Sequence, residues 1–181
     1  ENKIKKITSS ENAIAITNGT VGLRLALSLV GVNKGDEVIM PPLTFIATAN
    51  AIAHLNATPH FVDIEKDTLG LNPEILSKHL KNIAEKRNGV VFNKISGKKI
   101  AAVVPVHVFG LPAKIREIRD ICKRWGLPLV EDAAEALGRK VSMILGPTSI
   151  ETGGGSYLPG SVNLEKDIWC RPCSQNGKSP C

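Results

Sequence analysis

The stretch Leu-Val-Glu-Asp-Ala-Ala-Glu-Ala-Leu-Gly at residues 129–138 decides the fold of this chain. An apolar strand predicted at 127–130 runs directly into Glu131 and Asp132, and Glu135 follows three residues after Asp132. Acidic side chains at the carboxyl end of a buried strand lie where open α/β sheets bind their ligands. Because a buried carboxylate is costly without a cation, the stretch predicts a positive partner: a protonated ring nitrogen, a metal ion or an arginine.

Strand and helix patterns alternate upstream of this stretch. Strands are predicted at 13–17, 37–40, 59–63, 100–106 and 127–130. Helices are predicted from Thr20 to about residue 30 and at 46–54, 74–86 and 113–125, with Thr20 and Thr44 as caps and a hairpin or loop at 88–99. Strands separated by helices of about ten to fifteen residues predict an α/β fold with a parallel, doubly wound sheet.

Composition narrows the function classes. The 181 residues are 43% hydrophobic and 22% charged, which is typical of a globular protein. The sequence has no apolar run of about 20 residues that could span a membrane. Its net charge of +6 comes from scattered basic residues, and only 4% of residues are aromatic, so nucleic-acid binding is not expected.

The first residue is Glu rather than Met, and no signal-peptide pattern follows it. We therefore expect a fragment of a longer cytoplasmic protein. Cys170 and Cys173 form a Cys-x-x-Cys pair, but a closed zinc site needs four ligands. Since no second pair or nearby histidine accompanies them, no metal site is predicted.

The alternation stops at about Arg139. Residues 139–181 are rich in glycine and proline and contain three of the four cysteines, without a periodic element. We expect an irregular tail, which is either a genuine flexible segment or the product of translation in a shifted reading frame. The second explanation is favoured, because a sheet that has just presented its ligand carboxylates should continue into more fold.

A phosphate-binding turn is predicted at 17–22, Thr-Asn-Gly-Thr-Val-Gly. A strand, a small-residue turn and a helix start would direct backbone N–H groups at an anion, with Gly19 allowing close approach and the Thr20 hydroxyl adding a donor. The spacing matches neither a Walker A loop nor a Gly-x-Gly-x-x-Gly fingerprint. A capped helix without a ligand is the alternative.

Two further residues follow predicted strands. Phe45, in the segment Pro-Pro-Leu-Thr-Phe-Ile-Ala-Thr-Ala-Asn at 41–50, either stacks on a flat cofactor ring or belongs to the core. His107 follows the strand that ends at Val106, and we expect it to be a hydrogen-bonded loop residue rather than a site residue.

Four segments together resemble the DegT/DnrJ/EryC1/StrS aminotransferases. They are Asn18-Gly19-Thr20, the segment at 41–50, Pro-Val-His-Val-Phe-Gly at 105–110, and Glu-Asp-Ala-Ala-Glu-Ala-Leu-Gly at 131–138. The resemblance covers about residues 8–138 and is closest to the LegC-like branch. It implies that residues 1–138 are part of the large, mainly parallel-sheet domain of a type I pyridoxal 5'-phosphate enzyme, truncated at both ends.

The resemblance also implies roles for individual residues. Asp132 would pair with the protonated pyridine nitrogen and keep the ring an electron sink. Gly19 and Thr20 would hold the phosphate, and Phe45 would stack on the ring. Glu135 matches a position near the ring hydroxyl. Glu131 matches no such role and is interpreted as structural or exposed.

One element of the family pattern is missing. The family's Schiff-base lysine lies in a Ser-Phe-Asn-Gly-Asn-Lys type of segment roughly thirty residues after the aspartate. No lysine here has that context at that distance. The segment at 174–178, Ser-Gln-Asn-Gly-Lys, is too far downstream and one residue short, so Lys178 is not assigned and the catalytic residue stays unknown.

Two functional hypotheses remain. The first is an aminotransferase that passes an amino group, taken from glutamate, to a nucleotide-linked keto sugar in polysaccharide or nonulosonic-acid biosynthesis, as a family-type homodimer. The second is a non-catalytic fragment that retains part of a cofactor cradle. A dehydratase relative, in which histidine replaces the lysine, is disfavoured because no histidine follows His107.

Overall fold

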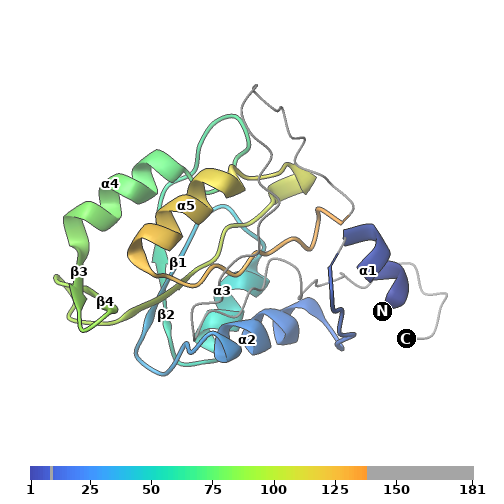
Figure 1. Ribbon diagram of the computed structural model, residues 1–181, viewed down its shortest axis with the longest axis horizontal. Coiled ribbons are helices and arrows are strands. Elements are labelled where there is room, and N and C mark those ends of the chain that lie inside the picture. Colours follow the sequence, from blue (N-terminus) through green and yellow to red (C-terminus); the bar gives the residue numbers. More distant parts are fainter. Residues whose placement is uncertain (9, 138–181) are drawn as a thin grey trace.

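Helices cover both faces of a parallel sheet in the computed structural model, which describes residues 1–8 and 10–137 (Figure 1). The helices are α1 (Asn2–Thr8), α2 (Gly19–Leu29), α3 (Ile46–Ala53), α4 (Pro73–Ile83) and α5 (Ile115–Trp125), with a short 3-10 helix η1 (Val108–Gly110). The strands are β1 (Glu37–Met40), β2 (Thr58–Phe61), β3 (Ala84–Arg87), β4 (Val90–Asn93) and β5 (Ile100–Val103). Helices α2 and α3 lie on one face of the sheet, and α4 and α5 lie on the other.

The central sheet has the order β2-β1-β5, and both strand pairs are parallel. The chain after α5 adds a further extended segment beside β5, with parallel bridges from Val103 to Leu129 and from Val106 to Asp132. The Asp132 N–H donates to the Pro105 carbonyl at 3.0 Å. The predicted parallel α/β sheet is therefore confirmed, and Asp132 lies at its carboxyl edge.

Strand β1 is buried on both faces, as a central parallel strand should be. Val38 and Met40 belong to the apolar cluster with α2 and α3, whereas Ile39 belongs to the cluster with α4 and α5. The alternation follows from the two-residue period of a strand. Two cores thus fix the sheet from opposite sides and hold its carboxyl edge in place.

The strand predicted at 13–17 is wrong. That segment has no strand assignment, and Ile14 is 66% exposed. A strand needs a hydrogen-bonding neighbour, and none of the described strands pairs with this segment. The helix cap was also misplaced: α2 begins at Gly19, and its cap is Asn18 rather than Thr20.

Helix α4 ends at Ile83, earlier than predicted, because Ala84 begins a hairpin. Strands β3 and β4 pair antiparallel around Asn88 and Gly89, whose φ angles are 50° and 79°. Two successive positive φ angles are the requirement of a type I′ turn, and Asn-Gly is its favoured sequence. The hairpin or loop predicted at 88–99 is therefore a hairpin, but its paired strands span 84–93.

Two expectations fall beyond what the structure describes: the tail at 139–181, including its cysteines, and Lys178 lie outside the described residues. Within the described part of the chain, every helix is too short or too polar to cross a membrane.

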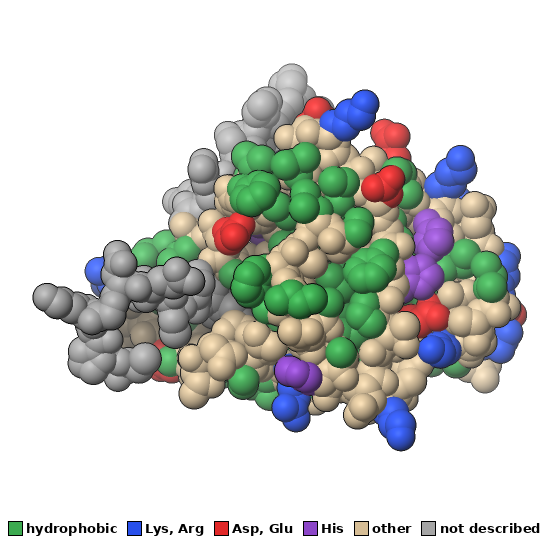
Figure 2. Space-filling model, turned by 180° about the vertical axis from the view of Figure 1, so that it is seen from behind, with side chains coloured by type: hydrophobic (Ala, Val, Ile, Leu, Met, Phe, Trp, Pro, Cys, Tyr) green, Lys and Arg blue, Asp and Glu red, His purple; other side chains and the backbone are tan. Residues whose placement is uncertain are grey.

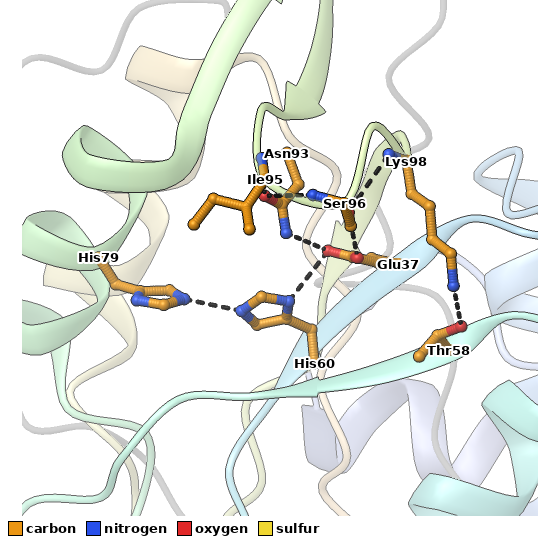
Figure 3. A network of polar contacts seen from close by, with 8 residues as sticks. All are labelled: Glu37, Thr58, His60, His79, Asn93, Ile95, Ser96 and Lys98. Carbon is orange, nitrogen blue, oxygen red and sulfur yellow. Dashed lines mark hydrogen bonds and ion pairs between the residues drawn. The ribbon is translucent and has the colours of Figure 1, made fainter.

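A network of polar side chains connects the amino end of β1 to neighbouring elements (Figure 3). The Glu37 carboxylate, on a residue only 5% exposed, accepts hydrogen bonds from Asn93 Nδ2 at 2.9 Å and Ser96 Oγ at 2.6 Å. It also contacts His60 Nδ1 at 2.9 Å, and His60 Nε2 lies 2.7 Å from His79 Nε2. The hairpin, β2 and α4 are thereby joined to β1 at the end of the sheet away from Asp132.

The network sets the protonation of its members. Burial alone would raise the pKa of Glu37, but hydrogen bonds from Asn93, Ser96 and His60, with the charge of His60, outweigh it and hold that pKa below its ordinary value. Burial lowers the pKa of His79, and the neighbouring charge of His60 lowers it further.

We predict that acidification weakens the fold through His79. Its pKa is depressed in the folded chain, so the unfolded chain takes up a proton first as the pH falls below 6.5, and stability is lost from there downward. Urea unfolding at about pH 7.5 and about pH 5.5 should show a lower free energy of unfolding at the lower pH.

The change His79→Gln should reduce this difference between the two pH values. His54→Gln is the matched control, because His54 is exposed, and it should leave the difference unchanged. The Glu37 contribution does not interfere, since it is lost only as the pH falls below 4.5. An unaltered pH difference in the His79 variant would contradict the assignment.

Candidate functional site

The side chain of Asp132 is the centre of the candidate site. Asp132 is 7% exposed, and its Oδ2 accepts a 2.6 Å hydrogen bond from the hydroxyl of Thr48, a residue 1% exposed on α3. Its Oδ1 accepts a 3.3 Å bond from the Ala134 N–H. The carboxylate therefore lies against α3 at the carboxyl edge of the sheet, where the sequence predicted a ligand.

Asp132 differs from the other buried carboxylates of the described chain. Each of the others has a nitrogen partner: Asp36 with Lys99 at 3.4 Å, Glu37 with His60 at 2.9 Å, and Glu65 with Lys114. Asp132 has no Lys, Arg or His within ion-pair distance among residues 1–8 and 10–137. A buried carboxylate without an internal cation is matched to a cation from a ligand.

The unused acceptor positions of the Asp132 carboxylate suit a protonated ring nitrogen. A carboxylate offers about four acceptor positions, and Thr48 and Ala134 use two of them. One further N–H⁺ donor can therefore be accepted without displacing either contact. A metal ion is less suited, since the described residues hold no group of three or more His, Cys, Asp or Glu side chains able to bind one.

The amino ends of α2 and α3 lie at the same edge of the sheet as Asp132. Helix α2 precedes β1 and so ends at the amino end of that strand, whereas α3 follows β1 and begins at its carboxyl end. The two helices pack against each other, and the cluster between them and the sheet includes Val130. Gly19 and Thr20, both partly exposed, form the first turn of α2.

Asn18 defines this helix start. Its Oδ1 accepts a hydrogen bond from the Val21 N–H at 3.0 Å, and its backbone is extended as a cap requires. Phe45 occupies the equivalent cap position of α3 and is 76% exposed. The core alternative for Phe45 is therefore wrong, and its ring stands free of the core beside the edge that carries Asp132.

The side chain of Glu135 is hydrogen-bonded to the loop after β5. Its Oε2 accepts a hydrogen bond from the Phe109 N–H at 2.6 Å. Phe109 has φ 54°, and Gly110 approaches so closely that a Cβ there would lie 3.0 Å from the Glu135 carbonyl oxygen. The loop at 107–111 therefore packs closely against the segment that contains Asp132 and Glu135.

His107 is a hydrogen-bonded loop residue, as predicted. Its Nδ1 accepts from the Ala113 N–H at 3.0 Å, so the neutral ring carries its proton on Nε2 and donates to Glu131 at 3.0 Å. Glu131 is therefore structural, which confirms its interpretation. The backbone N–H of His107 also donates to the Asp132 carbonyl, which fixes the strand position of the central carboxylate.

Thr48 is the site residue that sequence reasoning missed. It lies in an apolar helix between Ala47 and Ala49, and its only sequence signal is a polar side chain on the face that α3 turns to the core. Its partner is 84 residues away, so no local pattern could identify the contact.

A large groove of the described chain lies elsewhere. It has a volume of about 1140 Å³ and is formed by α4, α5 and the loops beside them, with basic side chains such as Lys81 and Lys114 alternating with acidic ones such as Glu74 and Glu117. None of the predicted site residues lines it. The balance of charge gives the groove no preference for a charged ligand, so the candidate site remains at Asp132.

Comparisons with known proteins identify the family to which this chain is similar. The sequence model of the DegT/DnrJ/EryC1/StrS aminotransferase family matches residues 1–144. Among solved structures, the chain is similar to DesV from S. venezuelae, with 32% identity and a TM-score of 0.64 over 76% of this chain. It is likewise similar to DesI, solved with its TDP-sugar product, with 33% identity and a TM-score of 0.63 over 79% of this chain.

A third similar structure is NtdA from Bacillus subtilis, solved with the bound cofactor PMP, with 28% identity and a TM-score of 0.62 over 76% of this chain. These alignments span 33% of DesV, 32% of DesI and 28% of NtdA, so the chain covers about a third of each. The shared part is the α/β architecture of pyridoxal-phosphate-dependent aminotransferases, as the resemblance implied.

We predict that Asn18→Ala lowers the free energy of unfolding by about 1 kcal/mol, because the Val21 N–H loses its acceptor at the start of α2. Asn18→Ser retains an acceptor at the cap and should stay close to the wild type. Urea unfolding of the 181-residue chain measures both. Equal losses for the two variants would show that the cap bond does not hold this helix end.

Proposed function

The chain belongs to the DegT/DnrJ/EryC1/StrS aminotransferase family, and on this premise we propose that it binds pyridoxal 5'-phosphate at the carboxyl edge of its sheet. The observation that carries the proposal is Asp132, a buried carboxylate with two neutral hydrogen-bond donors and no Lys, Arg or His within ion-pair distance among the described residues. Asp132 would pair with the protonated pyridine nitrogen of the bound cofactor, which would supply the positive charge.

Each residue proposed to hold the cofactor has a distinct role. Asp132 would hold the proton on the ring nitrogen, and the Gly19–Thr20 turn at the start of α2 would hold the phosphate with backbone N–H groups and a hydroxyl. Phe45 would stack on the ring face, and Glu135, whose Oε2 accepts from the Phe109 N–H, would lie near the ring hydroxyl. When bound, the cofactor supplies an electron sink for amino-group transfer, and these residues orient it.

We propose a nucleotide-linked keto sugar as the amino acceptor and glutamate as the donor. The similarity to DesI, which was solved with its TDP-sugar product, supports the acceptor class, and the LegC-like resemblance supports a role in polysaccharide or nonulosonic-acid biosynthesis. Such substrates are cytosolic, so we propose a cytoplasmic location.

A homodimer is the proposed assembly. Apolar side chains gather on one face of the chain (Figure 2), and large apolar residues exposed in the described chain include Phe45, Phe61 and Phe109. Exposed apolar surface of this kind is typical of a region that another surface covers.

The second candidate function is a non-catalytic chain that binds the cofactor but does not catalyse amino-group transfer. It is favoured by the sequence itself, in which no lysine stands in the family's Schiff-base segment at the expected distance from Asp132. The two candidates share cofactor binding and differ only in turnover, so separate measurements decide them.

We predict that Asp132→Asn weakens binding of pyridoxamine 5'-phosphate about tenfold to a hundredfold, since a hydrogen bond to a charged partner is lost. Pyridoxamine phosphate is the suitable probe because it has no aldehyde and so does not react with surface lysines. Its fluorescence titration gives the dissociation constant.

Asp63→Asn removes the same charge at an exposed position and serves as the control. It should bind like the wild type. Cofactor binding is refuted if the wild-type chain does not bind the probe, or if the two variants bind it equally well.

A separate prediction concerns turnover. Under the non-catalytic candidate, treatment with pyridoxal phosphate and then borohydride gives adducts spread over several lysines, which peptide mass spectrometry resolves, and glutamate yields no amino sugar from a nucleotide-linked keto sugar. A stable adduct at one lysine together with turnover would establish the aminotransferase candidate instead.

A further inference from the structure

We propose that Thr48 is a positioning residue that fixes the carboxylate of Asp132 for its ligand. This inference rests on the proposed cofactor binding and extends it to a residue that never touches the cofactor. Thr48 is 1% exposed, and its hydroxyl donates to Asp132 Oδ2 at 2.6 Å. That separation is in the range of a strong hydroxyl-to-carboxylate hydrogen bond.

The direction of the Thr48–Asp132 hydrogen bond follows from the number of protons available. A carboxylate accepts, so the single hydroxyl proton of Thr48 is used on Asp132. The Thr48 oxygen is then the acceptor in its 2.7 Å contact with the Thr44 hydroxyl, whose single proton is shared between Thr48 and the Phe45 carbonyl oxygen 3.1 Å away. Thr44 and Thr48 thus form a short relay of hydrogen bonds that ends on the carboxylate.

The relay joins two parts of the proposed site. Thr48 lies one helical turn after Phe45, the cap residue of α3, and the Thr48 N–H donates to the Phe45 carbonyl at 3.2 Å. The turn that carries the proposed stacking ring is therefore tied to the carboxylate proposed for the ring nitrogen. With the Ala134 N–H on Oδ1, the Thr48 hydroxyl holds Asp132 in one orientation and leaves acceptor capacity for the ligand.

Preorganisation of this kind raises affinity, because the carboxylate does not have to be ordered when the ligand arrives. Removal of the hydroxyl should therefore weaken the ligand even though the ligand does not contact Thr48. The effect should act only through Asp132, which distinguishes positioning from a general loss of stability.

The test is a titration of pyridoxamine 5'-phosphate with Thr48→Val, which replaces the hydroxyl with a methyl group. We expect an affinity about threefold to tenfold weaker than the wild type, and Thr48→Ser should restore it because serine keeps the donor. Thr58→Val makes the same change at an exposed threonine and should bind normally. The absorbance spectrum of the bound probe should shift in Thr48→Val and return in Thr48→Ser.

The double variant Thr48→Val with Asp132→Asn should bind no more weakly than Asp132→Asn alone, because Thr48 acts through that carboxylate. Additive losses would overturn the positioning role, as would wild-type affinity in Thr48→Val. If Thr48→Val does not fold by circular dichroism, Thr48→Ser and Thr48→Cys replace it. Cysteine is only a weak donor, so equal affinity of these two would overturn the role.

The two proposals fail in different ways. No binding by the wild type refutes the proposed function. Binding that depends on Asp132 but not on Thr48 leaves the proposed function intact and refutes only the inference about Thr48.

Discussion

A carboxylate buried at the carboxyl edge of a parallel sheet has to be matched by positive charge, and the site in this chain depends on that constraint. Asp132 is held by a hydroxyl and a backbone N–H, both neutral, while the other buried carboxylates of the described chain each have a nitrogen partner of their own. The position of Asp132 is set by its backbone bonds to Pro105 and His107. In the proposed function, the cation that pairs with Asp132 comes from the ligand.

The two ends of the sheet use polar groups in opposite ways. At the amino end of β1, Glu37 is satisfied by Asn93, Ser96 and His60, and its network joins the hairpin and α4 to the sheet. At the carboxyl edge, the acceptor capacity of Asp132 is only partly used. A fully satisfied network rigidifies the fold, and the unused acceptor positions of Asp132 are the ones that we propose for the ligand.

Sequence patterns could predict much of this arrangement because its signals are local. The apolar run at 37–40, the helical spacing in α4 and α5 and the carboxylates after Val130 lie within short windows, and they led to the parallel sheet and to Asp132. The strand expected at 13–17 failed because strand formation depends on a neighbour, which periodicity does not report. A similar limit applied to the end of α4, where the Asn-Gly turn of the hairpin overrode helical spacing.

The contacts that could not be predicted join residues far apart in the chain. Thr48 meets Asp132 across 84 positions, and Glu37 meets Asn93 across 56. Only the packing of helices and hairpin against the sheet brings such groups together. The family resemblance supplied the identity of the ligand, whereas the structure supplied the reason that Asp132 is suited to it.

The most direct measurement of the central claim is the ¹⁵N NMR spectrum of pyridoxamine 5'-phosphate labelled at the ring nitrogen and bound to the 181-residue chain. If Asp132 is the partner of the ring nitrogen, the bound nitrogen should keep the chemical shift of a protonated pyridinium at a pH where the free compound has lost that proton, and Asp132→Asn should abolish the difference. A bound nitrogen that titrates like the free compound would contradict the account.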